Sequence, residues 1–173
     1  DKGQKTSISL VGWGRYALAA VFLGYFTWTL FFGVIPFWKV QAINSEIRTV
    51  GSAEKRIPLY PKLFKTNVDR AGVLWRTSTD FQRGIADGPE ILENPEKAAL
   101  LLEELGVITK GYEDYVTSHP GTFRPHLNLA DVYIYHMLFG VNRLDEAEAV
   151  LDKAISLSDK YPQPYWMKAV ASL

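Results

Sequence analysis

The sequence predicts an all-α protein with one N-terminal transmembrane helix followed by an array of antiparallel helix hairpins. Three observations predict this fold class. The 23 residues from Tyr16 to Trp38 contain no formally charged side chain. After Lys39, apolar side chains recur at three- and four-residue spacing, without the sustained alternation that is typical of strands. Short segments that contain proline or glycine separate these helical stretches.

The uncharged run is long enough to cross a membrane. At 1.5 Å per residue it forms a helix of about 34 Å, against a hydrocarbon core of about 30 Å. It is too long for a cleavable signal peptide, and no small-residue cleavage site follows it. We therefore expect an N-terminal segment at 1–15, a transmembrane helix at 16–38 and a juxtamembrane linker or helix at 39–65.

The predicted transmembrane helix is unusually aromatic: nine of its 23 residues are Phe, Tyr or Trp. Ala17, Ala20, Gly24 and Thr27 share one stripe, a pattern by which membrane helices approach each other closely. Two interpretations are open, a helix that faces lipid on all sides and a helix that packs against other membrane helices or flat cofactors. The aromatic content would suit contact with a pigment or a quinone. Pro36 is expected to mark a kink or the exit from the membrane.

Residues 66–173 are expected to form the helical domain. The apolar spacing predicts helices over about 66–84, 95–105, 107–118, 125–138 and 143–158. Asn94-Pro95-Glu96 is a typical helix start, with a capping side chain before a proline. Gly106 is expected to separate the second helix from the third, and acidic pairs such as Glu103-Glu104 are expected on solvent faces.

The stretch 120–173 resembles a tetratricopeptide repeat, in which paired helices carry small residues where they cross. Pro120 stands where one repeat closes, and Leu144-Asp145-Glu146-Ala147 opens the second helix of the next repeat. The resemblance implies a repeat core made of Ala130, Tyr133, Ala147, Leu151 and Ala154. The sequence departs from the repeat pattern where His126 replaces an aromatic residue and where the segment from Tyr133 to Leu144 is about five residues too long.

The order of the segments is similar to that in the C-terminal region of bacterial O-antigen ligase/polymerase-type membrane proteins. The resemblance covers only a terminal span, a helical segment and the repeats, so no active-site residue of that family can be assigned here. It implies a domain on the periplasmic side of the cytoplasmic (inner) membrane. The distribution of basic residues does not decide which end of the span lies in the cytoplasm. Three basic residues precede the span and four follow it within about 20 residues, so the numbers on the two sides nearly balance.

The sequence offers few groups for catalysis. It has three histidines and no cysteine, and it lacks metal-ligand spacing and a nucleophile motif. We therefore expect no enzymatic activity, no cofactor and no metal. The 19 basic and 19 acidic residues balance, so we expect no nucleic-acid partner.

Helical repeats form surfaces that hold other proteins. The candidate contact residues, expected to be exposed on first helices, are Arg124, His126, Asn128 and Tyr135. The favoured function is a single-pass scaffold or accessory subunit that binds a larger integral membrane protein complex in the lipid bilayer, of respiratory, photosynthetic or envelope type. The alternative is the C-terminal portion of a glycosyl-transfer membrane enzyme whose catalytic part is absent here.

Overall fold

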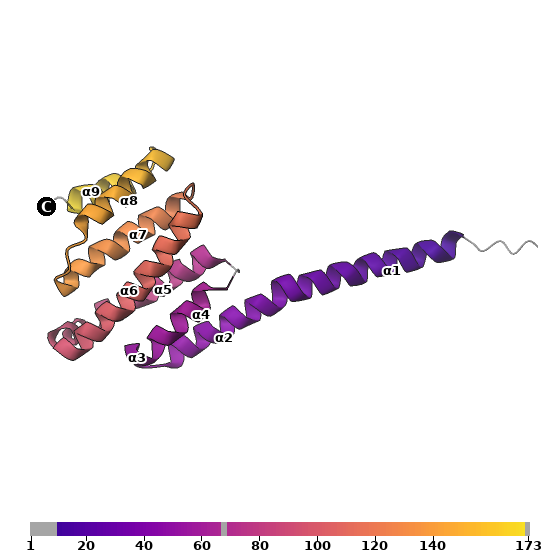
Figure 1. Cartoon of the computed structure of the whole chain (residues 1–173), viewed down its shortest axis with the longest axis horizontal. Helices are drawn as coiled ribbons and strands as arrows, with labels where there is room; N and C mark the ends of the chain where they lie inside the picture. The colour runs from indigo at the N-terminus through magenta and orange to yellow at the C-terminus, as the bar shows by residue number, and fades with distance from the viewer. Residues whose placement is uncertain (1–9, 67–68, 172–173) are drawn as a thin grey trace, which may run out of the picture.

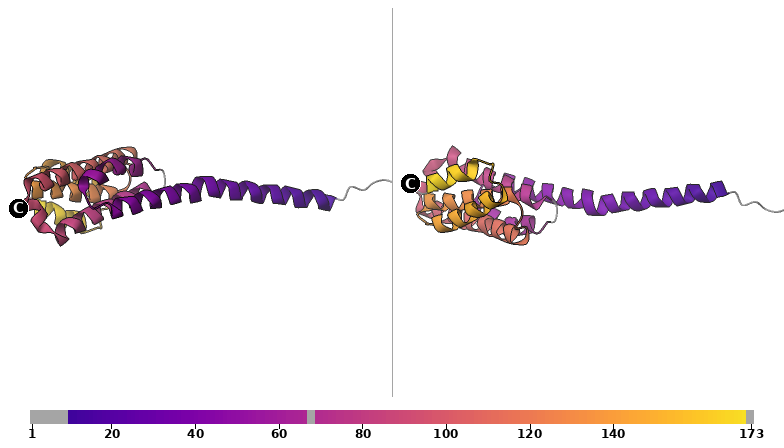
Figure 2. Two further views of the ribbon diagram at one scale, coloured as in Figure 1. Left: turned by 90° about the horizontal axis from the view of Figure 1, so that it is seen from below. Right: turned by 90° about the horizontal axis from the view of Figure 1, so that it is seen from above.

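The computed structural model describes residues 10–66 and 69–171, with side chains from residue 16 onward. Every regular element in these ranges is helical, which confirms the all-α fold class. A long N-terminal helix leads into a bundle of shorter helices (Figures 1 and 2). Expectations for residues 1–9, for residues 67–68 at the start of the predicted helix 66–84, and for residues 172–173 lie outside the described part.

The N-terminal helix is continuous from Leu10 to Thr49. It consists of α1 (Leu10–Thr29), the π-helical turn η1 (Leu30–Val34) and α2 (Ile35–Thr49). Its most apolar 18-residue window has a mean hydropathy of 1.9, and no residue of that window is buried. All side chains from Tyr16 to Thr29 are exposed. By length and composition, this helix can span a membrane.

Pro36 lies in the first turn of α2, directly after the π-helical turn. A proline has no N–H to donate to the preceding turn, and π-helical turns accommodate such a defect without ending the helix. At Pro36 the chain has a π-helical turn inside a helix that continues unbroken to Thr49, and the expectation that Pro36 marks a kink or the exit from the membrane stays a prediction.

The second half of α2 belongs to the core of the bundle. Val40 is only 4% exposed, and Ile43 and Ile47 pack against the same buried cluster. After Thr49 the chain turns back through α3 (Ala53–Arg56), η2 (Ile57–Leu59) and α4 (Tyr60–Phe64). The predicted juxtamembrane segment 39–65 thus contributes buried side chains to the domain.

The remaining elements follow in chain order, and α6 to α9 each pack against the next and alternate in direction (Figure 1). They are α5 (Arg70–Asp87), η3 (Pro89–Glu93), α6 (Pro95–Ser118), α7 (Phe123–Tyr135), η4 (His136–Phe139), α8 (Leu144–Leu157) and α9 (Gln163–Ala171). The start of α6 is as predicted, because the side chain of Asn94 accepts hydrogen bonds from the backbone N–H groups of Glu96 and Lys97, both at 3.1 Å.

Gly106 does not end a helix, so that expectation is wrong. α6 runs through it as one helix of 24 residues. A glycine inside a helix costs about 1 kcal/mol relative to alanine. On the same helix Leu105, Ile108 and Tyr112 are fully buried, and each buried side chain of this size contributes about 1.5–3 kcal/mol. Tertiary burial therefore outweighs the local preference of the glycine.

The predicted repeat core is buried as expected. Ala130, Ala147, Leu151 and Ala154 are all fully buried, and Tyr133 is nearly so. Alanine side chains allow the backbones of α7 and α8 to approach closely. The extra residues between Tyr133 and Leu144 form η4 and the loop after it.

We predict that replacing Ala154 with phenylalanine destabilises the protein. Ala154 is fully buried, so the larger ring has no space there, and overpacking of this kind costs about 1–3 kcal/mol. Thermal unfolding of the full chain in detergent, followed by circular dichroism, should show a lower melting temperature. Ala149→Phe is the matched control, because Ala149 is exposed on the same helix. Equal melting temperatures for the two variants would contradict the packing described here.

Candidate functional site

The exposed stripe of the N-terminal helix is one candidate interaction surface. Ala17, Ala20, Gly24 and Thr27 are all exposed, and a Cβ atom placed on Gly24 would meet no atom within 4 Å. Next to them the rings of Trp28 and Phe32 stack at a centroid distance of 4.2 Å. A shallow apolar groove that could receive another apolar helix is lined by Ala20, Leu23, Gly24, Thr27, Trp28, Phe31 and Phe32.

The predicted contact residues of α7 do not form one exposed surface. Arg124 is exposed, whereas Asn128 and Tyr135 are half-buried. The expectation that His126 is exposed is wrong: it is only 5% exposed, and its Nδ1 atom lies 2.7 Å from the carbonyl oxygen of Thr122. Its neighbours Pro125 and Leu127 are buried as well, because α7 lies between α6 and α8 and is covered on two sides.

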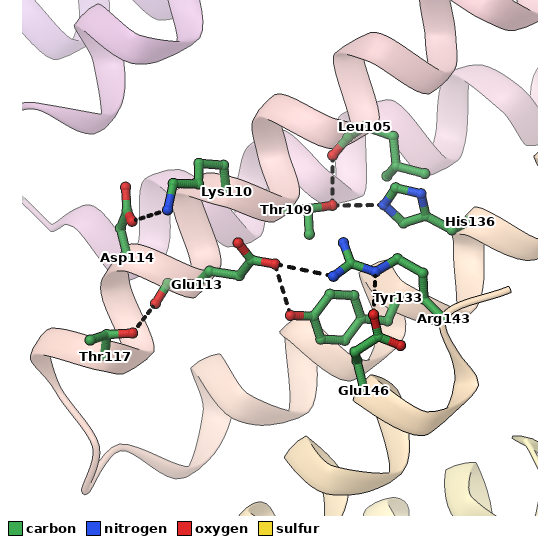
Figure 3. A network of polar contacts seen from close by, with 10 residues as sticks. All are labelled: Leu105, Thr109, Lys110, Glu113, Asp114, Thr117, Tyr133, His136, Arg143 and Glu146. Carbon is green, nitrogen blue, oxygen red and sulfur yellow. Dashed lines mark hydrogen bonds and ion pairs between the residues drawn. The ribbon is translucent and has the colours of Figure 1, made fainter. Parts of the chain in front are cut away.

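A polar network connects α6, α7 and the start of α8 (Figure 3). The hydroxyl of Tyr133 donates to Glu113 at 3.0 Å, and the guanidinium of Arg143 lies 3.5 Å from the same carboxylate oxygen. Arg143 also pairs with Glu146 at 3.0 Å and sits over the Tyr133 ring, 4.4 Å from its centroid. These groups satisfy one another across three helices, so the network stabilises the packing of α6, α7 and α8.

His136 lies beside this network in η4 (Figure 3). The hydroxyl of Thr109 donates to the carbonyl oxygen of Leu105 at 2.8 Å, and its oxygen lies 2.9 Å from Nε2 of His136. Nε2 must therefore carry the proton of the neutral ring. Nδ1 is buried without a hydrogen-bond partner in the described part of the chain. Burial, and secondly the charge of Arg143, lowers the pKa of His136 from its ordinary value.

Glu104 forms the most buried ion pair of the described residues. It is 1% exposed and lies near the middle of α6. Both its oxygens accept from Arg56, from Nε at 2.7 Å and from a terminal nitrogen at 2.8 Å, and the hydroxyl of Tyr60 donates to it as well. The hydrogen bond to Glu104 raises the pKa of Arg56, and burial raises the pKa of Tyr60.

The expectation that Glu104 lies on a solvent face is wrong. Its neighbour Glu103 is exposed, as expected. Glu104 is turned toward the segment that follows α2, where Arg56 and Tyr60 compensate its charge. Sequence spacing gives no signal for this contact, because the partners are 48 and 44 residues away.

A second polar contact joins α5 to α7. Nε2 of Gln82 donates to Asp131 at 2.6 Å, and burial raises the pKa of that carboxyl. The hydroxyls of Ser78 and Tyr112 lie 3.0 Å apart, and burial raises the pKa of Tyr112 to about 12. These groups also connect helices to one another.

The described residues contain no cluster of three or more His, Cys, Asp or Glu side chains that could hold a metal ion. The three histidines belong to different environments. His119 is exposed and stacks on Tyr115, whereas His126 and His136 are buried in α7 and η4.

We predict that Glu104→Ala strongly destabilises the protein. The change leaves the guanidinium of Arg56 and the hydroxyl of Tyr60 without their partner, and breaking a buried pair costs about 3–5 kcal/mol. Denaturant unfolding of the full chain in detergent measures this loss. Glu103→Ala is the control and should stay within about 0.5 kcal/mol of the wild type. A similar small effect for both variants would contradict the structural role of Glu104.

We predict that His136 makes stability depend on pH. Because its folded-state pKa lies below the ordinary 6.5, the unfolded chain binds this proton more readily than the folded chain. The stabilisation is complete above pH 6.5 and is lost as the pH falls through 6.5 toward the folded-state pKa. Unfolding free energies of the wild type and His136→Gln, measured from about pH 8 to about pH 5, should show a steeper acid loss for the wild type.

His119→Gln is the control for this measurement, since His119 is exposed. The same substitution at an exposed position shows how much of any change comes from the loss of a histidine alone. A His136→Gln profile with the same slope as the wild type would show that His136 does not carry this dependence.

Comparison of the chain with protein families, with curated proteins and with solved structures finds no match. The function of the chain is therefore inferred from its own residues and their arrangement.

Proposed function

We propose that this chain is a single-pass, membrane-anchored subunit whose tetratricopeptide-like helical domain binds and stabilises a larger integral membrane protein complex. One observation supports the membrane anchor. The same continuous helix is apolar and exposed from Tyr16 to Thr29 and is part of the bundle core in α2, where Val40 is buried. The first half has no covering element in the described part of the chain.

A bilayer is the environment that fits the exposed half. Most of the exposed large apolar side chains of the described residues lie between Tyr16 and Trp38. Soluble monomers rarely expose contiguous apolar patches larger than a few hundred Å². The exposed apolar side chains of this helix, nine of them aromatic, form a surface larger than such a patch, and lipid or a neighbouring membrane helix would cover it.

Two features support a protein partner. Small residues in membrane helices gain from close helix packing, and the stripe of α1 is free for such packing. At the other end of the molecule, α9 exposes Tyr165, Trp166 and Val170, and aromatic residues are enriched at protein interfaces. We assign no catalytic step, because Glu104, Glu113 and His136 each hold two elements of the fold together.

The resemblance to the O-antigen ligase/polymerase type supports a periplasmic position of the domain, at the inner membrane. The chain has no cysteine, so a single cysteine introduced at the exposed Lys153 would report this position. Reaction with a membrane-impermeant maleimide in spheroplasts supports the proposed side. Reaction only after lysis would place the domain in the cytoplasm.

We predict that Ala20→Leu weakens association with membrane partners. The leucine would keep a neighbouring helix away from the stripe, while its cost in lipid is negligible. Purification of the full chain in mild detergent, with quantification of the co-purified proteins, measures the effect. Ala19→Leu is a matched control, because Ala19 is equally exposed but lies about 100° around the helix. Unchanged association of the Ala20→Leu variant would exclude this face as the docking surface.

A further inference from the structure

Charge is distributed unevenly between the two parts of the helical domain. Residues 39–76 carry eight basic and three acidic side chains, a net charge of +5. Residues 77–171 carry eight basic and 15 acidic side chains, a net charge of −7. The positive part is the one that follows the membrane helix directly.

The packing of Val40 brings this positive part close to the end of the apolar run. Val40 is buried in the core only two residues after Trp38, so no free linker separates the apolar run from the domain. α4 runs back along α2, and the C-terminal end of α4 and the N-terminal end of α5 lie on the side of the domain toward α1 (Figure 1). Basic side chains at these helix ends therefore lie near Trp38, where the apolar run ends and the membrane helix would leave the hydrocarbon core.

Three lysines form this edge, which we call the basic edge: Lys39, Lys62 and Lys65. Arg70 nearby is half-buried, with its guanidinium 5.9 Å from the centroid of the Tyr115 ring, and the exposed Asp69 precedes it. The three lysines are exposed, and none of them forms an ion pair within the part of the chain that the structure describes. At the far end of α2, Arg48 pairs with Asp80 at 3.3 Å and Arg56 pairs with Glu104, whereas Lys55 on α3 is exposed and takes part in none of these ion pairs. The lysines of the basic edge are therefore uncompensated next to the membrane helix, while two of the three basic side chains at the far end of α2 are paired.

We propose that the basic edge binds the headgroups of anionic phospholipids and so holds the domain against the membrane surface. This inference depends on the proposed membrane anchor. A basic side chain near an anionic bilayer contributes about fivefold to surface binding, and salt weakens the contribution within a Debye length. Long lysine side chains can extend from α4 and from the end of the apolar run to reach the phosphates.

The test uses the full chain reconstituted into vesicles of phosphatidylcholine, with or without about 30% phosphatidylglycerol. A cysteine introduced at Thr66, beside Lys65, carries an environment-sensitive fluorophore, and a second sample carries it at Glu90, on an exposed position at the other end of α5. Both leaflets have the same composition, so the result does not depend on the direction of insertion. For the fluorophore at position 66, we expect a blue shift of the emission and quenching by brominated lipid only in vesicles with phosphatidylglycerol. Both effects should disappear at about 0.5 M salt.

Two charge-matched variants complete the test. Lys62→Gln/Lys65→Gln should abolish the response at position 66, whereas Lys97→Gln/Lys153→Gln, which removes two equally exposed charges elsewhere, should retain it. A response that is equal in both lipid mixtures, or equal in both double variants, would overturn the basic edge as a lipid-binding site. Flotation of the same samples separates the two proposals. If the protein floats with phosphatidylcholine vesicles but its fluorescence does not respond to phosphatidylglycerol, the membrane anchor is supported and only the basic edge is contradicted. If the protein does not float with vesicles, both proposals are contradicted.

Discussion

Glu104 places a carboxylate inside an apolar core, and its negative charge requires compensation there. Transfer of such a group from water costs several kcal/mol unless hydrogen bonds and an opposite charge replace the lost hydration. Arg56 and Tyr60 supply both from the short segment between α2 and α5. Because α6 also contacts α3, α4, α5 and α7, this one compensated charge links the segment after the N-terminal helix to the rest of the bundle.

The arrangement has a directional advantage over purely apolar packing. Apolar surfaces can shift relative to one another with little loss of packing energy. A guanidinium that binds both oxygens of a carboxylate, in contrast, accepts only a narrow range of geometries. The chain reverses at Thr49, and α3, η2 and α4 are all too short to be stable on their own. The contact with Glu104 gives these short helices a defined position on α6, with Leu63 and Phe64 buried beside it.

Features that depend on local pattern could be predicted from the sequence. The apolar run indicated a helix long enough for a membrane, Asn94 indicated a helix start, and the alanine spacing of α8 indicated a buried crossing. The errors share another origin. Glu104 and His126 have environments made by other helices, and α6 continues through Gly106 because Leu105, Ile108 and Tyr112 on the same helix are buried. One sequence contains no signal for these tertiary contacts. The exposed stripe of α1 and the position of Arg124 agree with expectation, but the contacts that would give them a role lie outside this chain.

The burial of Val40 has a mechanical consequence. A helix that is longer than the thickness of the apolar layer tilts to bury its whole length, and a thinner bilayer requires a larger tilt. Since α2 is at once the continuation of the apolar N-terminal helix and a member of the core, the domain turns with that helix. If the apolar half spans a bilayer, as proposed above, bilayer thickness would set the angle at which α9 and the far end of the bundle face the space above the membrane surface.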